Sequence, residues 1–284
     1  MSGSVRWKID RYYEELLRTR ELEKAKKRPF LAGDVVEFCE KLGFKPTTYQ
    51  EKLLRDTSRF VVARWSRQSG KSTSIGALIL HQALTRPGSR ILVLAPSLRQ
   101  SRWIIGKVSS FLARLPGRLV AGRVLKTRIE LLNGSIIEAF PNSPETVRGE
   151  TAHMVFIDEW GYVPNDDELY DAIVYSLSTT NGRFLATSTP GSRDTLFYAM
   201  CTDDTKFPGV SRHHVTYRDA LEPNGPLKGE ILEQIRQQMG SQPWRWRREM
   251  EAEFTDDEDA WFPIDLIMKC VDENYEYFTD QDLV

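Results

Sequence analysis

The sequence has few of the features that cross-link, anchor or export a protein. It contains only 3 cysteines, and Cys39, Cys201 and Cys270 lie too far apart for a zinc site, so we expect reduced thiols. No apolar run approaches the ~18 residues of a membrane-spanning helix, and the first residues lack the apolar core of a signal peptide. We therefore expect neither secretion nor membrane insertion.

Charged residues are abundant but unevenly distributed. They make up 28% of the 284 residues, while the formal net charge is only -1. Residues 1–128 contain 27 Lys and Arg against 10 Asp and Glu, whereas residues 129–284 contain 12 against 30. This asymmetry favours a polyanionic partner for the first part. A fold that interleaves the two parts would cancel the field, and the sequence leaves both possibilities open.

Short apolar runs alternate with helical patterns along most of the chain. We expect strands at 60–65, 90–96, 153–158 and 183–189, and helices at 34–42, 69–84, 98–114 and 166–177. Such alternation predicts a mostly parallel sheet with helices on both faces. Asn133-Gly134 predicts a hairpin between residues 128–132 and 135–140. The charged residues 5–28 predict a helical arm.

The strongest functional signal follows the expected strand at 60–65. Residues 66–73 open the next helix, which is the context that a phosphate-binding loop requires, although Trp65 replaces the usual first glycine. Backbone N–H groups of such a loop surround the β-phosphate of a nucleotide. We expect Lys71 on the β- and γ-phosphate oxygens and Ser72 on Mg²⁺. The nucleotide-binding candidates are Ser66, Arg67, Gln68, Ser69, Gly70, Lys71, Ser72 and Thr73.

Two acids end the expected strand at 153–158. A Mg²⁺-bound nucleotide needs a carboxylate at a strand tip near the phosphate loop, and Asp158 fits that requirement. Glu159 is then the candidate that orients or deprotonates the attacking water. A phosphate loop followed by such a strand end predicts a nucleoside triphosphatase. A third pattern, Ser188-Thr189 before Pro190-Gly191, offers hydroxyl groups near the γ-phosphate, or is an ordinary strand end closed by a turn.

Together these patterns resemble the ATPase domain of phage large terminase subunits, the DNA-packaging motors, and in particular those of thermophilic long-tailed phages. The resemblance covers roughly residues 35–260 and rests on Thr48-Tyr49-Gln50, the glycine-poor phosphate loop, residues 94–101, Ile157-Asp158-Glu159 and residues 187–192. It implies an additional-strand (ASCE-type) P-loop ATPase fold with a small C-terminal subdomain. The implied organisation is an N-terminal arm at 1–33, an ATPase domain at 34–255 and a linker or lid at 256–284.

The resemblance also implies roles and partners. Gln50 would bind the adenine, Arg67 would contact phosphate as a catalytic residue beside Lys71 and Glu159, and Ser188 and Thr189 would couple hydrolysis to movement. The cofactors would be ATP and Mg²⁺. A ring of five subunits in the host cytoplasm would dock on the portal protein of a procapsid, together with a small terminase subunit, and drive double-stranded DNA inward.

Two features depart from the family pattern. Relatives generally continue into a nuclease domain, which we do not expect in this chain. An arginine finger is expected on the strand before Pro141-Asn142, yet Ala139 stands there, so either an arginine was replaced or the finger lies elsewhere. Arg148 is then the best substitute and Arg128 the next. A missing finger would impair turnover, because such a residue raises rates by ~10³–10⁵.

A motor must also grip the DNA backbone without reading its sequence, which Lys and Arg do through phosphate contacts. The candidates are Arg99, Arg102 and Arg128, for each of which a solvated surface is the alternative. Two other functions remain open at this stage. One is a helicase or repair ATPase that depends on DNA, and the other is an assembly subunit that binds a nucleotide with little turnover.

Overall fold

The computed structural model describes residues 33–255 apart from 164, 165 and 241, together with residues 12–15, 17 and 270. The expected N-terminal arm at 1–33 therefore lies outside the described residues except for the helical residues 12–15 and 17 and for residue 33. The expected linker or lid at 256–284 also lies outside them, except for residue 270. No described helix is long and apolar enough to cross a membrane.

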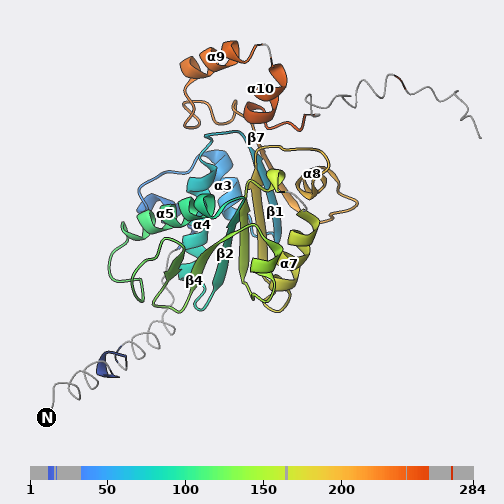
Figure 1. The fold of residues 1–284 in the computed structure, drawn as a ribbon. Helices are drawn as coiled ribbons and strands as arrows, with labels where there is room; N and C mark the ends of the chain where they lie inside the picture. Colours follow the sequence, from blue (N-terminus) through green and yellow to red (C-terminus); the bar gives the residue numbers. More distant parts are fainter. Residues whose placement is uncertain are drawn as a thin grey trace, which may run out of the picture.

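A seven-stranded sheet forms the centre of the fold, with the order β3-β4-β2-β5-β6-β1-β7 (Figure 1). All neighbouring strands are parallel except β3 and β4. β6 lies between β1 and β5, so the additional strand expected from the resemblance is confirmed. The strands are β1 (Phe60–Trp65), β2 (Arg90–Ala95), β3 (Arg128–Glu130), β4 (Ile136–Pro141), β5 (Met154–Asp158), β6 (Arg183–Ser188) and β7 (Ser211–Val215).

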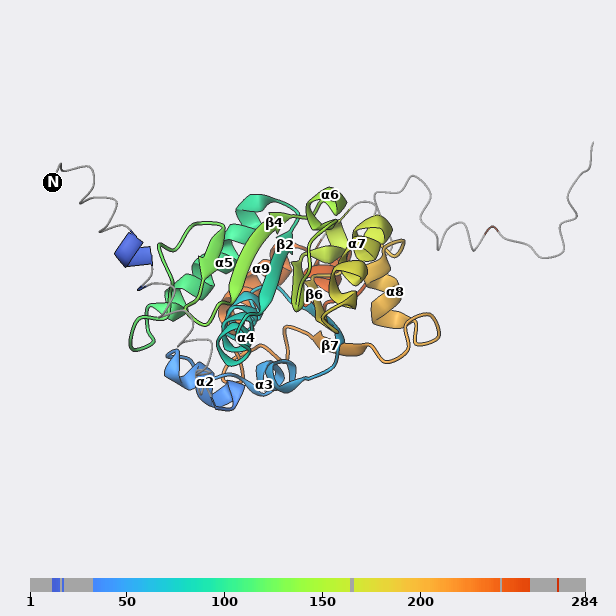
Figure 2. The ribbon, with the colours of Figure 1, turned by 90° about the horizontal axis from the view of Figure 1, so that it is seen from below.

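Helices cover both faces of the sheet, as predicted, and the view from below separates the two layers (Figure 2). The first layer contains α2 (Val35–Lys41), α3 (Thr48–Arg55), α4 (Lys71–Thr85) and α5 (Leu98–Leu112). The second contains α7 (Asp166–Ser178), α8 (Leu196–Thr202) and the 3₁₀ turn η1 (Trp160–Tyr162). The short helix α6 (Pro144–Val147) packs beside α7.

The central strands β1, β2, β5 and β6 contribute side chains to two separate hydrophobic cores. Val61 and Ala63 of β1 pack under the first helical layer, whereas Val62 between them packs under the second. β2 repeats the pattern, with Val93 in the first core and Leu92 in the second. Because successive side chains of a strand point to opposite faces, a buried parallel strand must be apolar at every position. This explains the continuous apolar runs in the sequence.

The expected hairpin is confirmed, although its first strand is shorter than predicted. β3 ends at Glu130 and pairs antiparallel with β4. Asn133 does more than turn the chain, because its amide donates to the carbonyl of Ala83 at 2.8 Å and its side-chain oxygen accepts from the Ser135 N–H. Gly134 adopts a left-handed φ of 84°, which glycine tolerates without strain. The turn therefore also fixes the end of α4.

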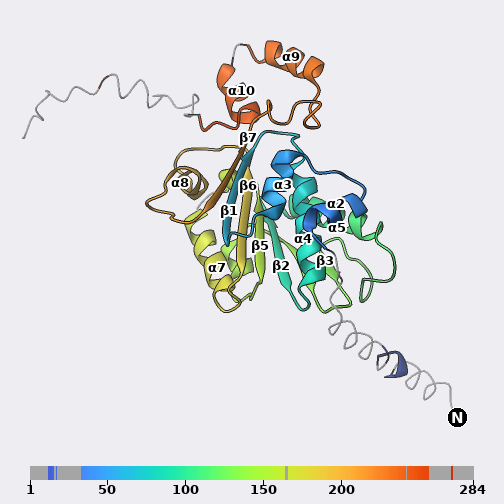
Figure 3. The ribbon, with the colours of Figure 1, turned by 180° about the vertical axis from the view of Figure 1, so that it is seen from behind.

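Residues 216–255 form a small C-terminal subdomain that contains α9 (Gly229–Gln238) and α10 (Pro243–Met250). It lies beyond the carboxyl ends of β1 and β7 (Figures 1 and 3). Its own small core includes Leu232, Trp246 and Met250. Backbone hydrogen bonds join it to the rest of the fold, among them Arg67 N–H to the carbonyl of Glu249 at 3.0 Å. The subdomain is thereby attached directly to the phosphate-loop segment.

A largely buried carboxylate fastens β7 to the segment before β1. Asp56 accepts hydrogen bonds from Ser211 at 2.6 Å, from His213 Nε2 at 2.7 Å and from the Ser58 N–H at 2.7 Å. Burial alone would raise the pKa of Asp56, but these hydrogen bonds outweigh it and hold the pKa far below its usual value of 3.8. A carboxyl group whose pKa is lowered by folding stabilises the fold at pH values above its pKa in the unfolded chain. This contribution is lost as the pH falls towards the pKa of the folded state.

We expect Asp56→Asn to lower the free energy of unfolding by about 1–3 kcal/mol at pH 7, because it weakens a charged acceptor shared by three donors. The difference from the parent chain should narrow as the pH falls from 5 towards 3. Urea unfolding at several pH values measures both effects. Asp34→Asn is the control, since this partly exposed acid should change stability by no more than about 1 kcal/mol. A pH-independent difference for Asp56→Asn would contradict the linkage.

Candidate functional site

The three sequence patterns meet at one edge of the sheet. β1, β5 and β6 are adjacent and parallel, so their carboxyl ends lie side by side. The register pairs Arg64 with Ser188 and Asp158 with Thr187. The phosphate-loop segment, the two acids and the Ser188-Thr189 segment therefore converge, although they are widely separated in the sequence.

The phosphate-loop segment is a tight turn held by its own hydroxyl groups. Ser69 is fully buried, and its Oγ donates to the carbonyl of Ser66 at 2.7 Å. Gly70 takes a left-handed φ of 85°, and its carbonyl accepts from the N–H groups of Thr73 and Ser74 at 3.1 Å. α4 begins at Lys71, so the free N–H groups of its first turn face the loop. This is the backbone arrangement that surrounds a phosphate.

Lys71 and the two acids share a pocket. Lys71 Nζ lies 3.3 Å from Glu159 Oε1 and 3.7 Å from Asp158 Oδ1. Burial raises the pKa of Asp158, Lys71 opposes the shift, and the neighbouring charge of Glu159 adds to it. Thr187 Oγ1 donates to Asp158 Oδ1 at 2.7 Å and fixes that carboxylate. The surrounding cavity has a volume of about 340 Å³.

Glu159 is oriented by the segment at the end of β6. Its Oε2 accepts from Ser188 Oγ at 3.3 Å and from the Thr189 N–H at 3.4 Å. The backbone of Glu159 is left-handed, with a φ of 53°, an uncommon conformation for a residue with a side chain. Tyr162 continues the connection, because its Oη lies 3.1 Å from Thr189 Oγ1 and donates to the carbonyl of Pro190 at 3.1 Å.

Two further sequence-predicted residues, Arg67 in the wall of the pocket and Gln50 beside the loop, are held by contacts with other segments. Arg67 forms an ion pair with Glu249 of the C-terminal subdomain, and this contact raises the pKa of the guanidinium above its usual value. Gln50 is buried against the loop, where its amide donates to the carbonyl of Ser69 at 3.5 Å and its Oε1 accepts from the Thr47 N–H. Its expected contact with adenine stays a prediction.

The three sequence-predicted positions for an arginine finger have different surroundings, and which of them supplies the finger stays a prediction. Ala139 is only 4% exposed and belongs to the core under the first helical layer. Arg128 is engaged by Glu130 at 3.0 Å and Glu138 at 3.3 Å. Arg148 differs from both, because its side chain is 61% exposed and its ion pair with Glu168 is long, at 3.9 Å. Of the named candidates, Arg148 alone is both exposed and weakly paired.

Two of the candidate DNA contacts lie on α5 of the first helical layer, and the third, Arg128, begins β3. Arg99 and Arg102 of α5 are exposed, and the guanidinium of Arg99 lies 5.5 Å from the ring centre of Trp103. Trp103 is itself 62% exposed and lines the pocket, as do Gln100 and Lys107. Sequence reasoning missed these three α5 residues, although their spacing of three and four places them on one face of a helix.

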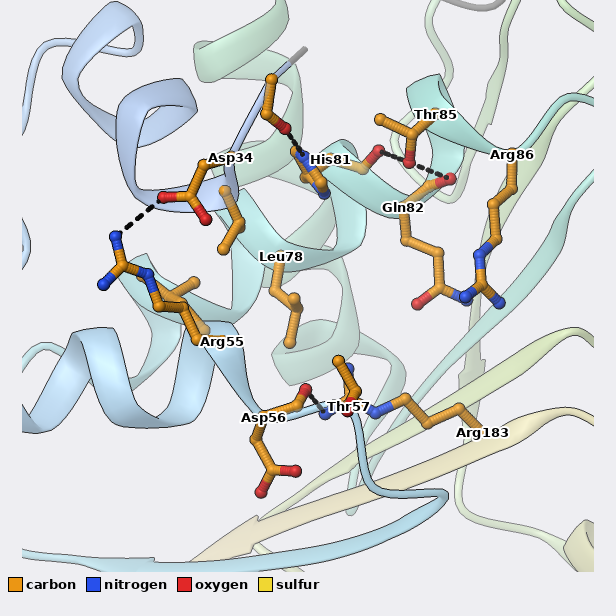
Figure 4. A pocket seen from close by; sticks show the side chains of 13 residues that line it. Asp34, Arg55, Asp56, Thr57, Leu78, His81, Gln82, Thr85, Arg86 and Arg183 are labelled. Carbon is orange, nitrogen blue, oxygen red and sulfur yellow. Dashed lines mark hydrogen bonds and ion pairs between the residues drawn. The ribbon is translucent and has the colours of Figure 1, made fainter. Parts of the chain in front are cut away.

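A larger cavity of about 550 Å³ lies at the other end of α4 (Figure 4). Its charged residues mostly contact one another or the backbone, since Arg55 donates to Asp34 at 3.0 Å and Arg183 donates to the carbonyl of Asp56 at 2.7 Å. None of the residues that line it belongs to the phosphate loop, the two acids or the Ser188-Thr189 segment. The smaller pocket, where these segments meet, is therefore the candidate functional site.

The fold and this site define an additional-strand P-loop NTPase. The profile of the family described as the N-terminal part of T4likevirus-type terminase large subunits matches residues 64–269. The chain belongs to this family.

Individual relatives agree with the assignment. The large terminase subunit of Thermus virus P23-45 is 31% identical over 173 residues, which cover 54% of this chain and 36% of that protein. The chain thus spans about a third of the length of the curated relatives it matches. The large terminase ATPase domain of Thermus phage P74-26 is 25% identical, with a TM-score of 0.64 over 77% of this chain and 98% of that one.

A more distant structure shares the fold. The large terminase of another thermophilic bacteriophage, solved in complex with ADP, is 15% identical, with a TM-score of 0.61 over 74% of this chain and 54% of that one.

The turn that contains Glu159 interlocks with the turn after β6. A Cβ atom added to Gly191 would lie 1.9 Å from the carbonyl oxygen of Gly161. We expect Gly191→Ala to lower the free energy of unfolding by about 1–3 kcal/mol, because the two backbones would have to separate. Gly106→Ala in α5 is the control, since nothing lies within 4 Å of its added Cβ and alanine favours a helix. Equal urea-unfolding midpoints for both variants would contradict the interlock.

Proposed function

We propose that this chain is the ATP-hydrolysing motor domain of a viral DNA-packaging terminase. The observation that carries the proposal is the convergence of Lys71, Asp158 and Glu159 on one pocket beside a phosphate-binding turn. Lys71 binds the β- and γ-phosphates, and the N–H groups of the loop and of the first turn of α4 bind the remaining phosphate oxygens. Glu159, held by Ser188 Oγ and the Thr189 N–H, accepts a proton from the attacking water.

The side chains also fit a Mg²⁺ ion. Ser72 offers a hydroxyl group and Asp158 a carboxylate, which are the hard oxygen ligands that Mg²⁺ prefers when a nucleotide supplies the others. Among the described residues, no group of three or more His, Cys, Asp or Glu side chains could hold a metal ion by itself. When bound, the ion would neutralise charge on the phosphates of the nucleotide.

The nucleotide class is proposed from the family and from the fold. The thermophilic-phage terminase that shares the fold was solved with ADP, and we infer that ATP occupies the corresponding pocket here. Gln50 and Tyr49 contact the carbonyl of Ser69 from the side of α3. To contact the adenine, the Gln50 amide would have to release the carbonyl of Ser69.

Translocation of double-stranded DNA by a ring of subunits is the finer part of the proposal. Support comes from the separation of charge between the two helical layers. The exposed Arg99 and Arg102 lie on α5, while the exposed Asp167 and Glu168 lie in the first turn of α7. The strands of the two sequence parts interleave, but their helices lie in separate layers. A basic face suits phosphate contacts with DNA.

We expect Glu159→Gln to reduce the rate of ATP hydrolysis by about 10²–10⁴-fold while ATP still binds, because only the proton acceptor is lost. Lys71→Ala should instead abolish tight ATP binding. Steady-state hydrolysis and equilibrium titration with labelled ATP measure the two effects. Unchanged turnover in Glu159→Gln would refute the assignment of the base, and would favour the alternative of an assembly subunit that binds ATP without consuming it.

Arg148 is the proposed finger, supplied to the pocket of a neighbouring subunit. We expect Arg148→Ala and Lys71→Ala, each assayed alone, to hydrolyse ATP about 10³-fold or more slowly than the parent chain. A mixture should regain hydrolysis, because the Lys71→Ala subunit donates Arg148 to the intact pocket of the other. Arg86→Ala, an exposed arginine away from the pocket, should need no complementation. If mixing at high concentration gives no gain, Arg148 does not act between subunits.

A further inference from the structure

Three cations line the candidate nucleotide pocket, and they differ in what already holds them. Lys71 is paired with Glu159 and Asp158, and Arg67 is paired with Glu249. Within the described part of the chain, the side chain of the third cation, Lys107 of α5, makes neither an ion pair nor a hydrogen bond. Its ammonium group therefore has no competing partner to give up when an anion enters.

The position of Lys107 depends on a glycine in the neighbouring helix. A Cβ atom added to Gly76 of α4 would lie 2.8 Å from Lys107 Cγ and 3.4 Å from Lys107 Cβ. The absence of that methyl group lets the lysine stem lie directly against α4, where it is only partly exposed. A lysine commonly packs its aliphatic stem in this way while its charged end stays in a polar space. Lys107 is one of the residues that line the pocket.

The surroundings indicate which ligand the ammonium group meets. Lys107 shares the pocket with Ser72 and Thr73 in the first turn of α4, next to Lys71. Gln50 and Tyr49, by contrast, contact the carbonyl of Ser69 from α3. α5 thus flanks the part of the pocket where the terminal phosphate is expected, and an ammonium group binds phosphate as a point charge.

We propose that Lys107 binds the γ-phosphate of the nucleotide and thereby distinguishes a triphosphate from a diphosphate. The proposal rests on the function proposed above, because it requires a nucleotide in this pocket. It assigns to α5, the helix that also carries Arg99 and Arg102, a direct contact with the phosphate that hydrolysis removes. Loss of that phosphate would release Lys107, whereas Lys71 would keep its contact with the β-phosphate.

The test compares ATPγS with ADP, each with Mg²⁺, by calorimetric titration of the whole chain. We expect Lys107→Met to weaken ATPγS about tenfold, which corresponds to about 1.4 kcal/mol, and to change the affinity for ADP by less than about twofold. Methionine keeps most of the stem that packs on Gly76. Lys52→Met, an exposed helical lysine on α3 that lines none of the described pockets, is the matched control and should change neither affinity.

A second variant tests the same contact without removing the charge. Gly76→Ala should displace the lysine stem and weaken ATPγS more than ADP, while the double variant should be no weaker than Lys107→Met alone, because the two changes act on one contact. Additive losses would show that Gly76 acts independently of Lys107. Thermal unfolding of each variant identifies any general loss of structure.

The outcomes separate this inference from the proposed function. If the parent chain binds neither ATPγS nor ADP, both fail. If the parent chain binds both and Lys107→Met binds them equally well, only the role of Lys107 is overturned. Equal losses for ATPγS and ADP in Lys107→Met would also overturn it, because Lys107 would then act on a part that the two nucleotides share.

Discussion

The site depends on one constraint, which is the adjacency of β1, β5 and β6 in a parallel sheet. Parallel strands present their carboxyl ends at the same edge, so whatever follows each strand is brought together. Insertion of β6 between β1 and β5 places Thr187 beside Asp158 and Ser188 beside Arg64. β6 thus fills the space between the phosphate loop and the two acids. It also supplies a hydroxyl group to each acid.

Because β6 touches both neighbours, its end is well placed to report a change at the pocket. Ser188 Oγ donates to Glu159 while accepting from the Gly161 N–H at 3.2 Å, and Tyr162 contacts Thr189 and Pro190. The close approach of Gly161 and Gly191 leaves little room for one turn to move without the other. A displacement of Glu159 would therefore also move the segment that follows β6. The coupling role predicted for Ser188 and Thr189 would act through these contacts.

Local patterns allowed much of the fold and of the site to be predicted from the sequence. Each buried strand is a short apolar run, and the loop and the acids are contiguous segments, so no knowledge of packing is needed to find them. The period of two along β4 is also visible in the sequence. Ile137 and Ala139 alternate with partly exposed positions and are both buried in the core under the first helical layer.

Contacts between distant elements could not be predicted in this way. Lys107 enters the pocket only because α5 packs closely on Gly76 of α4, and nothing local in either helix reveals that approach. The pair Arg67–Glu249 joins residues 182 positions apart and requires the C-terminal subdomain to fold back over the loop. Such contacts depend on how the helices pack against each other, which periodicity and composition leave undetermined.

The pair between Arg67 and Glu249 also sets a condition on any movement of the C-terminal subdomain. The backbone bond from Arg67 N–H to Glu249 would remain if the guanidinium turned towards a phosphate, but the ion pair would be lost. Glu249 would then be a carboxylate next to an incoming polyanion, which is unfavourable unless it moves away or gains another cation, and Arg248 lies 3.7 Å from it. A turn of Arg67 towards a bound phosphate would therefore link nucleotide binding to the position of α10 through the carboxylate of Glu249.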